Sequence, residues 1–310
     1  MKLFINNDNN DIMTDSDKIN LQCFTEYGMN FSNIQSYKIS NNIINSNNTY
    51  KSILLLPMTH INNIWHLMHH IFITYKYFKN NKVKYDMIYP IFFKGFYKRQ
   101  GIITDCIYND LIFKGLGLEC NNFKNIYEIF KKNEYININN IYYVNESINF
   151  HNEPLFDDFK KTILNNFNIK YNKDITKNIT FVLRNGTREI TNIDYVKYGL
   201  QSYNINYIYL ENHNVKEQLE IIANTDILIG VHGAGLTWCI FMKNNSTLIE
   251  MYPGNSNTDN YIRWCKIAKI NYKRLSINIT TGYANNFRNA SVNINNDQLQ
   301  TIITIFNTQS

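Results

Sequence analysis

Several features that assign a chain quickly to a class are missing from these 310 residues. There is no apolar run of about 18 residues, the length that predicts a membrane-spanning helix. The opening residues, MKLFINNDNND, also lack the apolar centre of a signal peptide. We therefore expect no membrane span and a soluble, cytoplasmic protein.

Cysteine is scarce and widely spaced. The chain has 5 cysteines and no C-x-x-C pair, so neither a zinc site nor a disulfide framework is predicted. Reduced and mostly buried thiols are the expected state. The cysteines are Cys23, Cys106, Cys120, Cys239 and Cys265.

The chain also lacks a strong charge of one sign. Its formal net charge is +6, from 31 basic and 25 acidic residues. Lys and Arg gather briefly at Lys94–Arg99, but no basic array interleaved with aromatic residues is present, so no nucleic-acid partner is expected. A mildly basic cleft would suit an anionic ligand, and a solvated surface explains the charge as well.

No G-x-G-x-x-G opens a strand–helix–strand unit with an acidic residue about 20 positions later, the pattern of a dinucleotide-binding fold. An NAD-linked enzyme is therefore disfavoured. What the sequence does contain is 44% hydrophobic residues, enough for a folded globular protein.

The most informative stretch covers residues 225–253. An apolar run at 227–231 predicts a buried parallel strand, 236–242 a short buried helix and 247–251 a second strand. His-Gly-Ala-Gly stands at 232–235, between the first strand and the helix. Glycine lets a backbone approach a ligand closely, and N–H groups at a helix start can face an anion. Such glycines are also common in α/β proteins that bind no phosphate, so both interpretations remain.

A second polar segment follows the predicted strand 178–183. Arg184 and Arg188 stand on either side of Gly186. Because guanidinium groups bind phosphate oxygens bidentately, the pair predicts a diphosphate clamp. A charged turn in solvent is the alternative.

Three histidines share one surface of a predicted helix that runs to Phe78, with Asn62 or Asn63 as its cap. His66, His69 and His70 are spaced i, i+3 and i+4. A polar stripe, a metal site and a catalytic base are the competing interpretations. The metal site lacks a neighbouring Cys or carboxylate partner.

Together these segments resemble the signature of glycosyltransferase family 61, the family of the O-mannose and EGF-domain N-acetylglucosaminyltransferases and plant xylosyltransferases. The resemblance covers roughly residues 55–255. Two positions depart from the family's pattern: His70 stands where relatives usually carry Asp or Glu, and Trp238 where they carry Asn. The matching residues are Asn63-Ile64-Trp65-His66, then Arg184, Arg188, Ile190 and Asn192 of an R-x-x-x-R-x-[IL]-x-N motif, then His232–Trp238 with Ile249-Glu250.

The resemblance implies an α/β fold of the GT-B type, in which two Rossmann-like domains face a cleft. Alternating strands and helices on both sides of the polar run 170–178 indicate the same. We expect an acceptor-side domain at 1–172, a nucleotide-sugar-binding domain at 173–290, and a terminal helix at 291–310 that could cross back to the first domain.

The lead-in, residues 1–50, mixes short apolar pieces with Asn, Ser and Asp and predicts an irregular segment with few strands. Asp15-Ser16-Asp17 spells a D-x-D, the metal–diphosphate motif of another class of transferase folds. No predicted strand precedes it, so a loop or a helix cap is expected.

By resemblance, the chain is an inverting hexosyl- or pentosyltransferase. It would move N-acetylglucosamine or xylose from a UDP-sugar to a hydroxyl of a glycan or protein. The alternative is a catalytically inactive relative that binds a glycan or a nucleotide sugar, which the departures at His70 and Trp238 suggest. Such a relative would bind a donor without turnover.

The resemblance also implies roles for single residues. His66 or His70 would be the general base, because a neutral imidazole can take the acceptor hydroxyl's proton. Glu250 would accept hydrogen bonds from ribose hydroxyls. No metal or other cofactor is required, since arginines and helix-start N–H groups can stabilise the departing diphosphate. The donor-binding residues would be Arg184, Arg188, His232, Gly233, Ala234, Gly235, Leu236 and Glu250.

Overall fold

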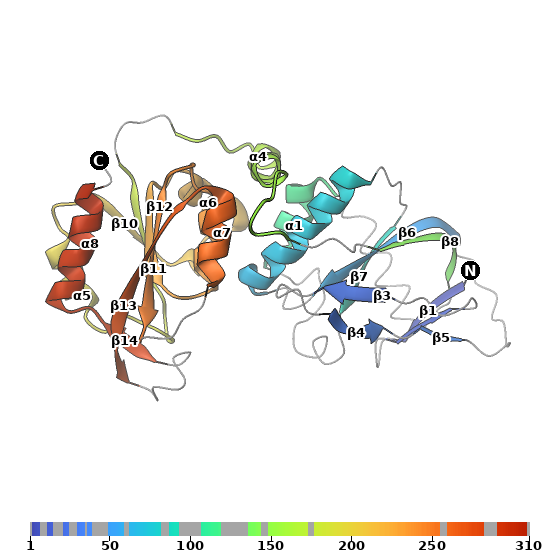
Figure 1. Cartoon of the computed structure of the whole chain (residues 1–310), viewed down its shortest axis with the longest axis horizontal. Helices are drawn as coiled ribbons and strands as arrows, with labels where there is room; N and C mark the ends of the chain where they lie inside the picture. Colours follow the sequence, from blue (N-terminus) through green and yellow to red (C-terminus); the bar gives the residue numbers. More distant parts are fainter. Residues whose placement is uncertain are drawn as a thin grey trace. The chain divides into compact units, whose positions relative to one another are not determined.

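We analysed a computed structural model of the whole chain (Figure 1). The chain divides into two compact units, Met1–Asn149 and Phe150–Ser310, and each is described by itself. The structure describes both backbone and side chains of residues 62–81, 107–118, 148–172, 177–254, 259–280 and 290–308. It describes the backbone alone of residues 2–6, 11–14, 21–24, 30–34, 36–38, 49–58, 87–92, 136–143 and 281.

The first unit is built on a mixed sheet with the strand order β5-β2-β1-β8-β6-β7. Strands β6, β7 and β8 pair in parallel, whereas β1 pairs antiparallel with both β2 and β8. A separate antiparallel pair joins β3 and β4. The strands are β1 (Lys2–Asn6), β2 (Asp11–Thr14), β3 (Leu21–Phe24), β4 (Asn30–Ile34), β5 (Ser36–Lys38), β6 (Thr49–Met58), β7 (Met87–Phe92) and β8 (Ile136–Tyr143).

Helix α1 (Ile64–Asn80) follows β6 along the chain, and a short π-helix, η2 (Leu111–Gly115), follows β7. Asn63 caps α1, because its side chain accepts a hydrogen bond from the Trp65 amide at 3.0 Å. This cap is one of the two that the sequence suggested.

The expectation of a strand-poor lead-in is wrong, because β1 to β5 and the start of β6 lie within residues 1–50. Short apolar pieces such as Leu3–Ile5 find ladder partners, and β1 pairs with β8 more than 130 positions away, as in the register of Lys2 with Asn137. A local pattern cannot reveal a partner so distant. Asp15-Ser16-Asp17 lies outside the described residues.

The second unit contains a sheet with the order β10-β9-β11-β12-β13-β14. All neighbouring strands from β10 to β13 pair in parallel, and β14 is antiparallel to β13. Along the chain, β9 is the first strand of this sheet. The next strand, β10, pairs with β9 on one side and forms the edge, and β11 then pairs with β9 on the other side. The strands are β9 (Ile179–Val182), β10 (Ile205–Ile208), β11 (Ile227–Val231), β12 (Thr247–Pro253), β13 (Asn271–Thr281) and β14 (Ser291–Asn293).

Helices cover both faces of this sheet. Figure 1 shows α5 and α8 on one side of it and α6 and α7 on the other. The α/β class expected for this part of the chain is confirmed. The helices are α4 (Phe156–Asn166), α5 (Ile193–Gly199), α6 (Val215–Ala223), α7 (Asn260–Ala268) and α8 (Asn296–Thr308), with the shorter η3 (Leu210–Asn212) and η4 (Ala234–Phe241).

The main core lies between the sheet and the α5–α8 layer. Alternate residues of β9, β11 and β12, such as Phe181, Ile229 and Met251, meet Val196 of α5 and Ile302 of α8, and all are buried. The terminal helix α8 therefore packs on the second unit's own sheet. The sequence had left open a crossing to the first domain.

Helix η4 forms part of the opposite layer. It corresponds to the short buried helix that the sequence predicted at 236–242. Trp238 is fully buried, with its ring 5.9 Å from that of Phe241. Trp238 is thus a core residue. Cys239 and Cys265 are buried, unbridged thiols with their sulfurs 4.0 Å apart, as expected; the other cysteines lie outside the described side chains.

Helix α4 packs within the second unit, although the sequence-based boundary at 172 placed it in the first domain. The ring of Phe156 lies 5.9 Å from Trp264 of α7, and that of Phe159 lies 6.2 Å from Phe241 of η4. These aromatic contacts fix α4 to the layer that also holds η4.

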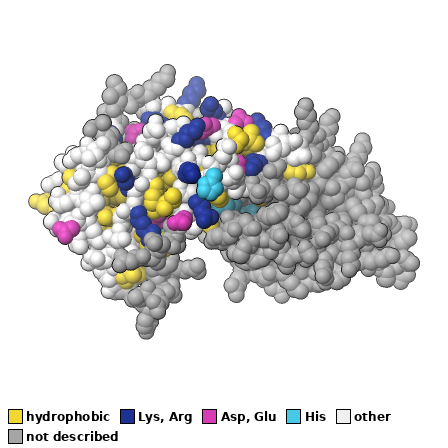
Figure 2. Space-filling view, viewed as in Figure 1, with side chains coloured by type: hydrophobic (Ala, Val, Ile, Leu, Met, Phe, Trp, Pro, Cys, Tyr) yellow, Lys and Arg dark blue, Asp and Glu magenta, His cyan; other side chains and the backbone are white. Residues whose placement is uncertain are grey.

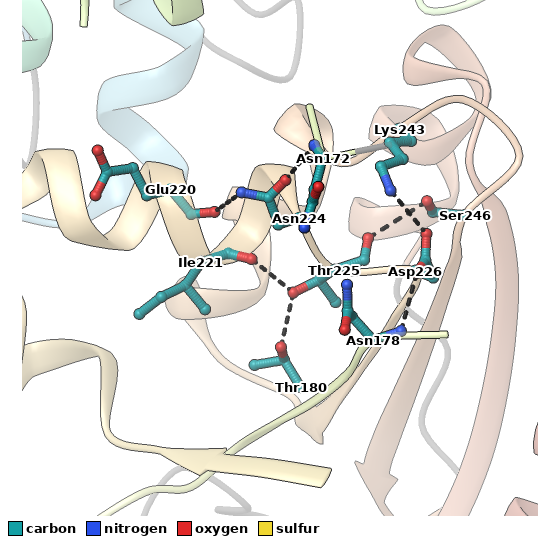
Figure 3. Close-up of polar contacts among 10 residues, drawn as sticks. All are labelled: Asn172, Asn178, Thr180, Glu220, Ile221, Asn224, Thr225, Asp226, Lys243 and Ser246. Carbon is teal, nitrogen blue, oxygen red and sulfur yellow. Dashed lines mark hydrogen bonds and ion pairs between the residues drawn. The ribbon is translucent and has the colours of Figure 1, made fainter. Parts of the chain in front are cut away.

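A polar network ties together the amino ends of the strands (Figure 3). Thr180 and Thr225 share a hydroxyl–hydroxyl hydrogen bond of 2.7 Å, and the Asn178 amide donates to Asp226 at 2.9 Å. Lys243 lies 3.4 Å from the same carboxylate. Polar side chains at this edge of the sheet therefore bind one another and hold the strand ends together.

Helix α6 begins with a capping box. The Asn214 side chain accepts from the Glu217 amide at 3.0 Å, and Glu217 accepts from the Asn214 amide at 2.9 Å. We expect Asn214→Ala to lower the free energy of unfolding by about 0.5–2 kcal/mol, because the Glu217 amide loses its hydrogen-bond acceptor. Urea denaturation measures the free energy of unfolding. Asn206→Ala is the control, because Asn206 is an exposed residue of β10. Equal losses in both variants would contradict it.

The described surface carries charges of both signs. In Figure 2, Lys and Arg side chains are interspersed with Asp and Glu and with apolar side chains. Such mixing generates no strong field of one sign on that face. No described helix combines the length and apolar composition needed to cross a membrane.

Candidate functional site

The carboxyl edge of the second sheet holds the candidate site. Between β9 and β11 the strand order reverses, since β10 follows β9 on one side and β11 pairs with it on the other. Open α/β sheets bind ligands in the crevice outside the strand ends at such a point. Arg184 comes shortly after β9 and His232 directly after β11. The topology thus brings together two segments that the sequence singled out separately.

Arg184 and Gly233 are in direct contact. A Cβ atom on Gly233 would lie only 1.9 Å from Arg184 Nη1, so a residue without a side chain is required for this approach. Arg184 Nε also donates to the Thr187 carbonyl at 3.0 Å. Gly186 forms this turn with a φ of +80°. The guanidinium is therefore held over the start of η4.

Burial lowers the pKa of the Arg184 guanidinium, while nearby Tyr261 and Glu211 raise it. An arginine remains charged under any physiological condition. The site therefore contains a fixed, partly dehydrated positive charge beside backbone N–H groups, a favourable setting for an anion.

The second arginine of the motif has a different environment. Arg188 has a φ of +57° and its amide donates to the Ala290 carbonyl at 2.7 Å. Its side chain is half-buried and close enough to Tyr261 to influence the pKa of that phenol. Ile190 is a buried core residue, and the Asn192 side chain donates to the Ile294 carbonyl at 2.8 Å. The R-x-x-x-R-x-[IL]-x-N motif thus contains Arg184 of the candidate site, the core residue Ile190, and Asn192, which hydrogen-bonds to a distant part of the chain.

His232 is held by a buried carboxylate. Its Nδ1 contacts Glu250 Oε1, and Glu250 Oε2 accepts a hydrogen bond from the Tyr272 hydroxyl at 2.5 Å. The Glu250 side chain is 1% exposed and that of His232 is 12% exposed. Both oxygens of Glu250 are therefore occupied by protein, a different environment from the ribose contact that the sequence suggested. His232 is the more exposed partner of the His232–Glu250 pair.

Several tyrosines and one arginine lie around His232 that the sequence analysis did not select as site residues. Tyr261 donates to the Gly233 carbonyl at 2.5 Å, and the rings of His232 and Tyr252 are 4.6 Å apart. The Arg274 guanidinium lies 4.2 Å from the Tyr252 ring. Burial, with Glu250 nearby, raises the pKa values of Tyr261 and Tyr272. In a chain with 23 tyrosines, nothing in the sequence distinguished these.

The predicted base residues lie on α1 in the first unit. His66 is half-buried, whereas His69 and His70 are each 4% exposed. His69 Nδ1 lies 2.8 Å from the Trp65 carbonyl oxygen. Of the interpretation as a solvent-facing or satisfied polar stripe, burial excludes the solvent-facing form for His69 and His70, and the hydrogen bond of His69 fits the satisfied form. Within the described parts of the chain, no group of three or more His, Cys, Asp or Glu could hold a metal ion.

Comparison with known proteins agrees with these segments. The family model described as Glycosyltransferase 61 matches residues 64–249. The EGF domain-specific O-linked N-acetylglucosamine transferase of Drosophila melanogaster is 36% identical over 106 residues, 33% of this chain and 20% of that protein. An alpha-1,3-arabinosyltransferase of Oryza sativa subsp. japonica is 40% identical over 50 residues, 15% of this chain and 9% of that protein.

The human protein O-linked-mannose beta-1,4-N-acetylglucosaminyltransferase 2 is 28% identical over 61 residues, 20% of this chain and 10% of that protein. The aligned regions span about a fifth or less of these relatives' own length. The similarity therefore concerns one part of larger proteins.

Proposed function

The chain belongs to glycosyltransferase family 61, and on that premise we propose that it transfers a sugar from a nucleotide-sugar donor to a hydroxyl of a glycan or protein. We further propose inversion at the anomeric carbon, a UDP-linked donor and a GT-B arrangement. The relatives are named for N-acetylglucosamine and arabinose transfer. N-acetylglucosamine or a pentose such as xylose is accordingly the sugar we expect.

One observation carries this proposal: the contact of Arg184 with Gly233 at the reversal point of the second sheet. It combines a guanidinium with the backbone at the start of η4. A diphosphate is the part of a nucleotide sugar that such a pair binds, and it takes up negative charge as the sugar leaves. The positive groups would stabilise that charge without requiring a metal ion. Arg188 would contribute from its half-buried position.

His232 would bind the diphosphate or the sugar side of the donor. Because Glu250 is buried and accepts from Tyr272, we propose that it positions the His232 ring and does not contact the ribose. A carboxylate against Nδ1 fixes the orientation of an imidazole. Gly233, Ala234, Gly235 and Leu236 would supply backbone contacts.

His66 is our proposed general base. An acceptor hydroxyl must reach the base, and His66 is half-buried whereas His70 is 4% exposed. The Trp65 ring lies 4.9 Å from that of His66 and supports it at the start of α1. His70, which is more buried on the same helix, would then be a packing residue.

The donor site is tested by thermal shift and calorimetry with UDP, GDP, UDP-N-acetylglucosamine and UDP-xylose, each with and without Mn²⁺. A ligand of the folded state raises the melting temperature by mass action. We expect a metal-independent shift with one nucleotide class. In Arg184→Ala the dissociation constant should rise by about 100-fold or more, since both hydrogen bonds of a bidentate guanidinium are lost.

Lys161→Ala is the matched control, because it removes an exposed positive charge of the same unit from α4. It should leave the binding unchanged. If no nucleotide shifts the wild-type protein, the diphosphate site is wrong. A donor that binds without any turnover would support an inactive relative in place of an enzyme.

A further inference from the structure

Once Glu250 is assigned to His232, the donor site proposed above includes no carboxylate that is assigned to the hydroxyls of a ribose. A carboxylate is the group that accepts from both hydroxyls of a ribose in nucleotide-binding sheets, where it follows the first strand–helix turn by about 20 residues. This inference rests on the proposed function and concerns the nucleoside half of the same ligand.

The segment after β10 lies next to this site. Strand β10 is the direct neighbour of β9, and the Leu183 amide donates to the Ile208 carbonyl at 2.7 Å, where the two strands end. Helix η3 follows at Leu210–Asn212. A Cβ on Gly235 would lie 3.2 Å from Leu210 Cδ1. Helix η3 is therefore packed against the start of η4.

Glu211 is the carboxylate of η3. Its side chain is exposed, and no hydrogen bond or ion pair with another described residue holds its oxygens. The neighbouring Leu210 is 5% exposed and anchors the helix in the core. Glu211 also acts electrostatically on Arg184, although burial is the larger influence on that guanidinium. An accessible carboxylate thus stands on a fixed segment beside the diphosphate-binding arginine.

We propose that Glu211 binds the ribose of the nucleotide, accepting hydrogen bonds from its vicinal hydroxyls while Arg184 and the start of η4 hold the diphosphate. The nucleoside would then lie over the ends of β9 and β10, along η3. Glu211 takes the role that the sequence suggested for Glu250. Exposure distinguishes the two carboxylates, because Glu211 is exposed whereas the Glu250 side chain is 1% exposed and contacts His232 and Tyr272.

The test removes the Glu211 carboxylate and the ribose hydroxyls separately. Calorimetry compares UDP or GDP, whichever binds the wild-type protein, with its 2′,3′-dideoxy counterpart and with inorganic pyrophosphate, on wild type, Glu211→Gln and Glu220→Gln. We expect Glu211→Gln to weaken ribonucleotide binding by about 10-fold, the value of one charged hydrogen bond. It should leave dideoxynucleotide and pyrophosphate binding unchanged.

Glu220 is the matched control, because its exposed carboxylate pairs with Lys216 on α6. Glu220→Gln should bind all three ligands as the wild type does. If Glu211→Gln changes ribo- and dideoxynucleotide affinity by the same factor, the carboxylate acts only through the charge of Arg184 and the ribose assignment is overturned. Absence of any nucleotide binding in the wild type overturns instead the proposed function on which the assignment rests.

Discussion

Gly233→Ala should strongly weaken donor binding while leaving the protein folded. The new Cβ would lie 1.9 Å from Arg184 Nη1 and 2.9 Å from its Cζ. The φ of Gly233 is 169°, an extended value that alanine also adopts, so the effect is steric and not conformational. A guanidinium at the end of a long side chain can move aside, and it would leave the site when it does.

We expect Gly233→Ala to weaken nucleotide binding by about 100-fold or more, because both hydrogen bonds of a bidentate guanidinium are lost. Calorimetry with the nucleotide measures the affinity, and the melting temperature of the unliganded protein reports folding. The double variant with Arg184→Ala is the control. Since both changes remove the same contact, their effects should not add. Full additivity would contradict the mechanism.

The second large effect concerns Lys160, a buried lysine of α4. Its side chain is 4% exposed, and its Nζ donates to the Met242 carbonyl at the end of η4 and to Asn244 Oδ1, the latter at 3.3 Å. The ring of Tyr171 lies 5.7 Å away. Burial lowers the pKa of Lys160 from 10.5 to about 8, opposed in part by Asp157.

This shift has a defined sign. Between pH 8 and 10.5 the unfolded chain binds the lysine proton and the folded protein does not, so stability rises with pH in that window. The cost of burying the charge is fully present below pH 8. We expect the wild type to gain about 2–3 kcal/mol relative to Lys160→Met between pH 7 and pH 10, from roughly 1.4 kcal/mol per pKa unit.

Urea denaturation of both proteins at pH 7 and pH 10 measures this difference. Lys161→Met is the control, since Lys161 is exposed one position further along α4 and should follow the wild type. Parallel pH profiles of wild type and Lys160→Met would show that the charge is not buried in the folded protein.

Much of the second unit could be predicted from the sequence. The apolar run at 227–231 matches β11, and the strand predicted at 247–251 lies within β12. Parallel strands buried on both faces are continuous apolar runs, and helices with caps have a 3.6-residue period. In the first unit the same reasoning missed β1 to β5, because their pairing depends on partners elsewhere in the chain.

The candidate site was predicted unevenly. Arg184, His232 and Gly233 stand at strand ends and carry a family resemblance, so a local pattern was sufficient to select them. Glu250 was selected equally well, but its surroundings could not be predicted, because Tyr272 and His232 reach it from β13 and the end of β11. The same limit applies to Tyr261, which reaches Gly233 from α7.

The sequence by itself determined the alternation of strands and helices in the second unit, the family, and the two segments that form the candidate site. Those properties depend on residues close together in the chain, whose spacing sets local structure. Only the tertiary structure decided that Trp238 is a core residue, that Glu250 holds His232, and that Arg184 touches Gly233 with Glu211 nearby. Burial and contact across strands depend on the strand order of the sheet, which no local pattern contains.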